Sequence, residues 1–246
     1  MPEQPDLRVN RLLALLPRAE YDPIQRIATI IDTQHHDVIY ADGGEPEFAY
    51  FPLGAVMSFI ATDADGRGVE AASVGLEGMV GLSGVLGGGG MIGEVVTQIS
   101  GPTARVTIDA LRAEVDKRRV LAHVLERYTV ALLSQISQGL VCNRHHPVDS
   151  RAARWLLATH DRVGEDHFVL TQDFLAIMLG VTRPQVSLAA ASLRRAGLID
   201  YRRGRVEVLD RSGLEAAVCE CYGIIQGEFA RLLRNDGHNG WPAVGG

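Results

Sequence analysis

The sequence predicts an α+β protein with an N-terminal antiparallel β-roll (jelly-roll-like), one long helix and a C-terminal helical domain that carries a β-hairpin. Between residues 37 and 108, short β-prone runs alternate with turns rich in glycine and aspartate, which is typical of an antiparallel roll or barrel. Between residues 110 and 143, apolar residues recur every three or four positions, as on one face of a helix. Residues 170–210 contain two short helical patterns, a tight turn and an arginine-rich hairpin. The chain has 246 residues, enough for two domains with separate cores.

The N-terminal part is expected to hold two short helices, over residues 7–16 and 23–31. The first ends at Pro17 and has an apolar face that consists of Leu12, Leu13, Leu15 and Leu16. Six strands follow, and the turn Asp63-Ala64-Asp65-Gly66 joins two of them as a hairpin. These strands are expected over residues 38–40, 48–51, 56–62, 69–74, 95–99 and 105–108.

The stretch from Ala110 to Asn143 is expected to form a single long helix, which ends at His145-His146-Pro147. Its apolar residues fall at spacings of 4, 3, 4, 4 and 4, which is close to a coiled-coil seam. A helix buried against its own domain is the alternative. We expect a dimer interface formed by Leu121, Leu125, Tyr128, Leu132, Ile136 and Leu140.

After a helix expected over residues 147–163, two short helices are joined by a tight turn. Thr171 caps the first, and Gly180 ends it, since glycine tolerates the left-handed conformation at a helix end. Thr182 and Gln185 form a capping box at the start of the second helix.

The second of these helices separates into a core face and a polar face. The core face consists of Val186, Ala189, Ala190 and Leu193. The polar face can read DNA bases, because arginine bonds guanine, glutamine bonds adenine, and an outward leucine fits a thymine methyl group. The expected base contacts are Arg183, Gln185, Ser187 and Leu188.

A hairpin follows over residues 197–209, with Arg203-Gly204 placed for its turn. Its arginines are suited to phosphate contacts, which provide affinity and register rather than sequence choice. Two helices, a turn and such a hairpin indicate a winged helix-turn-helix, a DNA-binding module. The expected phosphate contacts are Thr171, Gln172, Thr182, Arg202, Arg203 and Arg205. A last helix is expected over residues 213–233.

This C-terminal part resembles that of the Crp/Fnr superfamily of bacterial transcription regulators. The matching patterns are L-T-x-x-x-L-A-x-x-L-G-V-x-R-x-x-V-S from Leu170 and A-G-L-I-x-Y-x-R-G-R-x-x-x-L-D from Ala196. The resemblance extends more diffusely over nearly the whole chain. It implies a homodimer that binds double-stranded palindromic DNA, with RNA polymerase as a further partner. The implied parts are a cyclic-nucleotide-binding-like sensor (1–113), a dimerisation helix and hinge (114–146), a DNA-binding domain (147–234) and a disordered tail (235–246).

Members of this superfamily that bind cyclic AMP hold it with a glycine–glutamate segment and a downstream arginine–serine pair. In this chain Leu82 stands at the carboxylate position, and the acidic Glu94 lies near the place of the arginine. We therefore expect no control by cyclic AMP, and the effector is unknown. The candidate effector pocket consists of Gly81, Leu82, Ser83 and Arg105.

Charge and composition narrow the function classes. The net charge is −6, yet residues 151–211 hold 10 arginines and 7 acids (+3), which leaves −9 for the remainder. A basic module on an acidic body is typical of a protein that contacts DNA at one end. No catalytic set stands out, and neither a membrane span nor a signal peptide is visible. The expectation is a cytoplasmic regulator that is not an enzyme and does not contact a membrane. The competing function is a small-molecule (nucleotide) sensing module that acts through protein contacts.

The three cysteines fit a reducing compartment. Cys219-x-Cys221 is too short for the usual Cys-x2-Cys metal knuckle, and on a helix its two side chains would diverge. Both are interpreted as small helix residues. The pairs His35-His36 and His145-His146 are alternatives as haem or metal ligands, but the sequence favours no metal and no cofactor.

Overall fold

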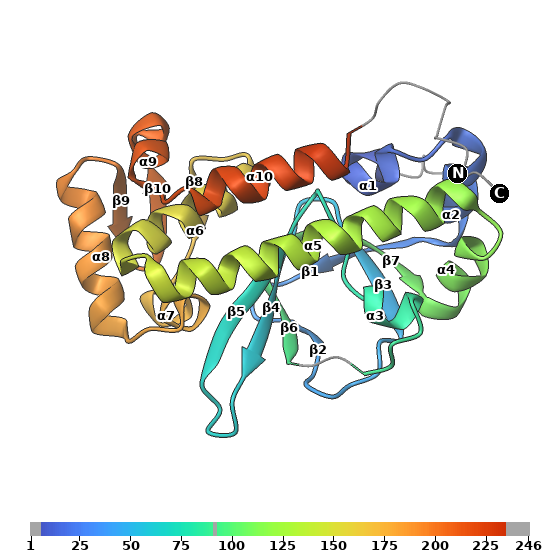
Figure 1. Cartoon of the computed structure of the whole chain (residues 1–246), viewed down its shortest axis with the longest axis horizontal. Helices are drawn as coiled ribbons and strands as arrows, with labels where there is room; N and C mark the ends of the chain where they lie inside the picture. Colours follow the sequence, from blue (N-terminus) through green and yellow to red (C-terminus); the bar gives the residue numbers. More distant parts are fainter. Residues whose placement is uncertain (1–5, 91–92, 235–246) are drawn as a thin grey trace.

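In the computed structural model, which describes residues 6–90 and 93–234, a β-roll lies against a long helix that leads to a C-terminal helical domain (Figure 1). The predicted α+β class and the order of its parts are confirmed. The predicted tail over residues 235–246 lies outside the described residues.

Two antiparallel sheets form the roll. The first has the order β1-β7-β3, with bounds Thr29–Thr33, Gly101–Thr107 and Phe48–Pro52. The second has the order β2-β6-β4-β5, with bounds Val38–Tyr40, Glu94–Ile99, Val56–Thr62 and Gly68–Val74. The six predicted strands are present, and β4 and β5 pair as the predicted hairpin. The strand β1 was missed.

The N-terminal helices differ from the prediction. Pro17 does not end a helix but precedes the next one, and Pro23 lies inside that helix. Pro23 has no N–H and cannot donate to the Ala19 carbonyl one turn earlier in the helix. That carbonyl accepts a hydrogen bond from Arg118 Nη1 instead, at 3.3 Å. Residues 29–31 form a strand rather than a helix. Their backbone pairs with β7, and their β-branched side chains favour the extended conformation. The helices are η1 (Leu7–Val9), α1 (Arg11–Ala14) and α2 (Arg18–Ile27).

The predicted single helix after the roll is two helices with a break at residues 116–118. The break allows Glu20 of α2 to cap the second of them, since its Oε2 accepts from the Leu121 N–H at 2.8 Å. The helices of this region are α3 (Leu82–Val85), α4 (Ile108–Val115) and α5 (Arg119–His145). Ile108 starts α4 rather than ending a strand.

The N-terminal half of α5 faces the roll, which contradicts part of the predicted dimer interface. Leu121, Leu125 and Tyr128 are buried in the core of their own chain, at 1 %, 1 % and 0 % exposure. The Tyr128 hydroxyl also donates to the Met79 carbonyl at 2.9 Å. The exposed side of the helix carries other apolar side chains, which include Val130, Leu133, Leu140 and Val141.

The C-terminal domain packs helices against a small antiparallel sheet. Its helices are α6 (Val148–Val163), α7 (Gln172–Leu179), α8 (Arg183–Arg195) and α9 (Arg211–Ala217). The sheet has the order β8-β10-β9, with bounds His167–Val169, Arg205–Val208 and Ile199–Arg202. The sequence analysis predicted β9 and β10 as a hairpin and missed β8.

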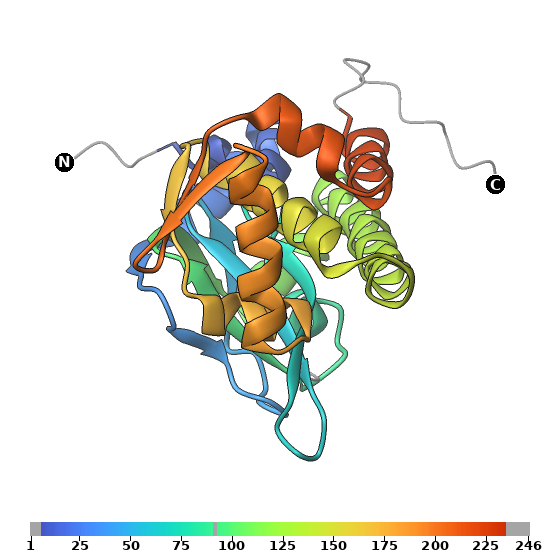
Figure 2. The same ribbon diagram turned by 90° about the vertical axis from the view of Figure 1, so that its left-hand side faces the viewer.

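The predicted last helix is also divided. A break at residues 218–220 separates α9 from α10 (Cys221–Leu232). This break turns α10 back along α5, and the two helices lie side by side in both views (Figures 1 and 2). Among residues 6–90 and 93–234, no single helix is long and apolar enough to cross a membrane. The bent pair α7–α8 has the length and composition of a membrane span only when its two helices are counted together.

The roll and the C-terminal domain are in direct contact. The β1–β2 loop places His35 and His36 against Phe174 of α7, with ring centroids 5.3 and 5.4 Å apart. His35 Nδ1 lies 2.7 Å from the Gln98 carbonyl, whereas its Nε2 is buried with no hydrogen-bond partner among the residues described. Burial lowers the pKa of His35 below its ordinary value.

A nearly buried ion pair joins the same two parts. Arg162 of α6 donates from Nε to Glu77 at 2.7 Å, and the two side chains are 9 % and 13 % exposed. Arg162 also donates to the carbonyl of Ser73 in β5 at 3.2 Å. These bonds fix α6 against the end of the roll.

Candidate nucleic-acid interface

The helices α7 and α8 have the geometry of a helix-turn-helix. Their axes turn by 104° over the three residues 180–182, and Gly180 has the left-handed φ of 59° that this turn requires. The Thr171 hydroxyl accepts from the Phe174 N–H at 3.1 Å and caps α7. Gln185 Oε1 accepts from the Thr182 N–H at 2.9 Å, so the predicted capping box is present.

The helix α8 has the two predicted faces. Its inner face packs into the C-terminal core through Val186, Ala189, Ala190 and Leu193, none more than 5 % exposed. Arg183, Gln185 and Leu188 lie on the outer face, and Leu188 is 72 % exposed. Figure 1 shows α8 at the opposite end of the molecule from α2. The outer face is therefore open to a large ligand.

The four predicted base-contact residues are not equally free. Ser187 is half-buried, and its hydroxyl donates to Gln172 of α7 at 2.6 Å. Arg183 lies 3.5 Å from Asp173, but both side chains are about two-thirds exposed, and such a pair contributes little energy. The Gln185 oxygen is used in the cap, which leaves its NH2 group to donate. Arg183, Gln185 and Leu188 can thus reach a partner, and Ser187 is held against α7.

The hairpin β9–β10 turns at Arg203 and Gly204, whose φ angles of 50° and 74° are both left-handed, as in a type I′ turn. The Leu170 N–H donates to the Gly204 carbonyl at 2.8 Å, and the Tyr201 hydroxyl donates to the Leu170 carbonyl at 3.0 Å. Burial raises the pKa of Tyr201, so this hydroxyl stays protonated. The hairpin is therefore held beside the start of α7.

The arginines of the hairpin differ in their charge environment. Arg202 pairs with Asp200 at 2.9 Å, because residues two apart on a strand share a face. The sequence analysis overlooked this acid. Arg203 and Arg205 are exposed and have no ion-pair partner in the described part of the chain. Their charges are the ones available to a phosphate backbone.

Two further cations near this surface were missed by the sequence analysis. Arg194 and Arg195 end α8 and are exposed, and Arg194 lies 3.3 Å from Asp200. Together with Arg202 they line a surface groove of about 560 Å³ between α8 and the hairpin. The signal in the sequence was a second arginine pair, Arg194-Arg195, that lies eight residues before the Arg202-Arg203 pair.

The predicted effector-pocket residues lie around a filled part of the roll. Gly81, with φ 95°, precedes α3, and Leu82 is buried in the core of the roll. The Arg105 guanidinium stacks over the Phe48 ring, 4.6 Å from its centroid. A buried cluster between the two sheets fills this region with Tyr40, Tyr50, Met57, Val74, Val80 and Val95.

The surface pocket beside α3 is acidic. It has a volume of about 410 Å³ and is lined by Glu45, Glu47 and Asp109. The lining cation Arg112 donates to the Gly84 carbonyl and is thus occupied. Such a pocket disfavours a phosphate group.

Comparison with known proteins agrees with this geometry. Residues 150–217 match the family model of the Crp-like helix-turn-helix domain. The C-terminal domain belongs to this family. Residues 150–217 therefore form a Crp-like helix-turn-helix domain. A comparison with curated proteins gives no match.

The fold of the whole chain is similar to that of several solved structures. FixK2 from Bradyrhizobium japonicum is 18 % identical, with a TM-score of 0.68, and 78 % of this chain and 98 % of that chain are covered. A CRP-family transcriptional regulator from Thermus thermophilus is 20 % identical (TM-score 0.64, 76 % and 95 % covered). A CRP/FNR-family regulator from the same organism is also 20 % identical (TM-score 0.62, 77 % and 97 % covered). The similarity of fold to these structures therefore includes both the roll and the C-terminal domain.

Proposed function

We propose that this protein is a cytoplasmic Crp/Fnr-type transcription regulator that binds a palindromic DNA site as a homodimer, independently of cyclic AMP and cyclic GMP, and that it also contacts RNA polymerase. The outer face of α8 carries the proposal. It presents Arg183, Gln185 and Leu188, each able to recognise a base edge in the major groove, at the N-terminal end of an exposed helix. Ser187 has a lesser share, because its hydroxyl is engaged with Gln172.

Phosphate contacts surround this face. Arg203 and Arg205 at the hairpin turn supply charge that no acid in the described chain neutralises, and Arg202 supplies less because of Asp200. Thr171 and Gln172 at the start of α7 add neutral donors for phosphate contacts. Thr182 at the start of α8 has a lesser share, because its hydroxyl and its N–H both donate to Gln185 Oε1, at 3.0 and 2.9 Å.

A second copy of the chain is the proposed occupant of the exposed side of α5. Exposed residues recur there at spacings of 4, 3, 4, 3 and 4, which is the heptad pattern of a two-stranded coiled coil. Leu132 and Ile136 are half-buried beside this stripe, and only Leu140 of the originally predicted seam lies fully on it. The stripe consists of Glu126, Val130, Leu133, Ser137, Leu140 and Arg144.

Two features of the roll support independence from cyclic nucleotides. Arg105 is stacked on Phe48, and the buried aromatic cluster fills the space between the sheets beside it, which leaves little room there for a nucleotide. The pocket beside α3 is lined by three carboxylates and one cation, Arg112, which donates to the Gly84 carbonyl, so the lining is net negative and disfavours an anion. A micromolar dissociation constant for cyclic AMP in titration calorimetry would contradict this part of the proposal.

DNA fragments selected from genomic DNA by the full-length protein, followed by anisotropy titrations, test the proposal. The selected sites should contain two inverted half-sites. Arg183→Ala should lose about 1–3 kcal/mol on the selected site and little on random DNA. Arg18→Ala, which changes an 87 % exposed arginine on α2 at the far end of the molecule, should have no effect (Figure 1).

The hairpin is tested by Arg203→Asn, because asparagine tolerates the left-handed conformation while the charge is removed. Binding should weaken about equally on all sequences, and the slope of log K against log salt should fall by about 1. Equal losses for Arg183→Ala on selected and random DNA, or selected sites without inverted symmetry, would refute the proposed reading mode.

A further inference from the structure

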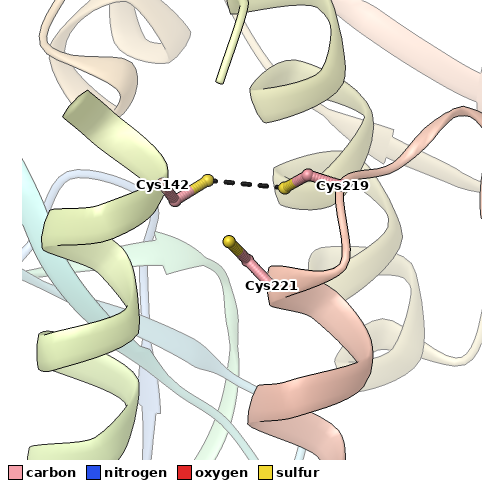
Figure 3. Close-up of side chains that lie close together, drawn as sticks. All are labelled: Cys142, Cys219 and Cys221. Atoms are coloured by element: carbon pink, nitrogen blue, oxygen red, sulfur yellow. Dashed lines mark hydrogen bonds between the residues drawn. The ribbon is translucent and has the colours of Figure 1, made fainter. Parts of the chain in front are cut away.

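Three buried cysteines from distant parts of the chain meet at one point. Cys142 lies near the end of α5, Cys219 precedes α10, and Cys221 is the first residue of α10 (Figure 3). They are 0 %, 7 % and 0 % exposed and are free thiols. Their Sγ atoms all lie within 4.8 Å of one another, and those of Cys142 and Cys219 are 3.6 Å apart.

The sequence analysis expected Cys219 and Cys221 to diverge on one helix. In the structure the helix begins at Cys221, and Val218 has an extended backbone with φ −75° and ψ 157°. The Tyr222 N–H donates to the Cys219 carbonyl at 3.2 Å, so the chain turns at Cys219–Tyr222, and both sulfur atoms point toward Cys142 (Figure 3). The short spacing does not prevent the two thiols from sharing a ligand.

The separation of the sulfur atoms matches metal coordination. Zinc–thiolate bonds of about 2.3 Å in a tetrahedron place two sulfur atoms about 3.8 Å apart. A disulfide instead needs about 2.05 Å, and it would leave one of the three cysteines unpaired. The 3.6 Å between Cys142 and Cys219 is close to the tetrahedral edge.

A candidate fourth ligand, His146, lies beside Cys221, with its ligand atom within 4.8 Å of that sulfur. His146 follows Cys142 by four residues, so both side chains lie on the same side of the helix end. The His146 Nε2 is buried and has no hydrogen-bond partner among the described residues, although Glu220 Oε1 lies 3.4 Å from it. Such a buried nitrogen calls for an explanation in a folded protein. His146, Glu220 and Cys221 form a second group whose ligand atoms lie within 4.8 Å of one another.

The charge of such a site would be balanced by Arg151. Three thiolates and a neutral imidazole around a divalent cation carry one net negative charge. Arg151 is 6 % exposed, and its Nε has no hydrogen-bond partner within the described structure. Burial lowers the pKa of Arg151, and negative charge on Cys142 and Cys219 would raise it again. Its Nη2 donates to Asn143 at 2.9 Å, which holds the cation beside the cluster.

We propose that Cys142, Cys219, Cys221 and His146 bind a thiophilic divalent cation of the zinc type. Soft thiolates with one imidazole are the donor set that zinc takes in closed structural sites. The bound ion joins the end of α5, directly before Pro147, to the start of α10. It thereby fixes the position of α10 on α5 and the orientation of the DNA-binding domain that follows Pro147.

The test uses full-length protein without a histidine tag, purified under reducing conditions from cells supplied with zinc. Elemental analysis should give one zinc per chain. Replacement by cobalt(II) should produce the visible bands of a tetrahedral ion together with thiolate-to-cobalt charge transfer in the near ultraviolet. Because the zinc content and the cobalt spectrum are measured on the unaltered protein, the test does not depend on how well any variant folds.

Variants assign the ligands. Cys142→Ser should lose the charge-transfer intensity of one thiolate and most of the bound zinc. His146→Gln should lower zinc affinity at least about tenfold, since losing even an outer-shell partner costs about 10–100-fold. The matched control is His145→Gln, which changes the exposed neighbouring histidine and should bind zinc like the unaltered protein. Less than a tenth of an equivalent of zinc together with no thiolate–cobalt band would overturn the proposal. DNA binding through α8 is measured separately and can succeed when this site fails.

Discussion

Replacing Leu133 and Leu140 by glutamate should convert the proposed dimer into a folded monomer. The two side chains are 57 % and 69 % exposed on the outer side of α5, so the single chain does not depend on them. Surface substitutions of this kind change the free energy of unfolding by about 0.5 kcal/mol or less. The two substitutions should therefore weaken the association of two chains and leave the folding of each chain almost unchanged.

The magnitude follows from the exposed surface. Fully burying a leucine side chain contributes about 1.5–3 kcal/mol, and the two exposed fractions together amount to slightly more than one leucine. The loss is about 2–4 kcal/mol for each chain and about twice that for the symmetric pair. This corresponds to a dissociation constant raised between about 10³- and 10⁶-fold, before the repulsion of the new charges is counted.

Sedimentation velocity over a range of concentrations is the assay. Leu86→Glu is the matched control, because Leu86 is a 53 % exposed leucine that lies beyond α3 rather than on α5. It should sediment as the unaltered protein does. Leu125→Ala should instead lower the free energy of unfolding by about 2–5 kcal/mol, since Leu125 is 1 % exposed. A double glutamate variant that remains dimeric, or an unaltered protein that is monomeric at micromolar concentration, would refute the reasoning.

Three further predictions concern the stability of the single chain in urea unfolding. Tyr128→Phe should cost about 1–3 kcal/mol, because the buried Met79 carbonyl loses its 2.9 Å partner; an unchanged midpoint would contradict this. Glu77→Gln should cost about 3–5 kcal/mol, because the buried Arg162 loses the carboxylate that lies 2.7 Å from its Nε; a loss below about 1 kcal/mol would show that water or the neighbouring carboxylates Glu70 and Asp161 compensate the guanidinium. Because burial lowers the pKa of His35, its neutral form is the one that the fold favours. The contribution of His35 to the free energy of unfolding is complete above the ordinary pKa of about 6.5 and is lost as the pH falls through the lowered pKa. His35→Gln should therefore flatten the decline in stability between about pH 7 and 5. Parallel plots of stability against pH for the variant and the unaltered protein would contradict the assignment.

The sequence by itself determined the elements whose chemistry is local. The Thr182–Gln185 capping box, the glycine that ends α7 and the Arg203-Gly204 turn depend on contacts within a few residues, and each is present in the structure. The strands β2 to β7 were readable for the same reason, since alternating apolar runs and turn residues act over short distances. The strand β1 was missed because its apolar run also fitted a helix.

Only the tertiary structure decided which face of α5 is covered. The helix carries apolar residues on two sides, and its periodicity describes both sides equally well. The roll covers Leu121, Leu125 and Tyr128, which leaves Leu133 and Leu140 exposed. Burial depends on what the rest of the chain places against a helix, and this information is not present in the spacing of its own residues.

The cysteine cluster has the same physical origin. Cys142 lies 77 residues before Cys219, and the break between α9 and α10 brings their sulfur atoms to 3.6 Å. The break itself was invisible in a helical pattern that continued across it. Sequence spacing measures distance along the chain, whereas coordination depends on distance in space, so the thiols could be recognised as one site only after α10 was seen to fold back on α5.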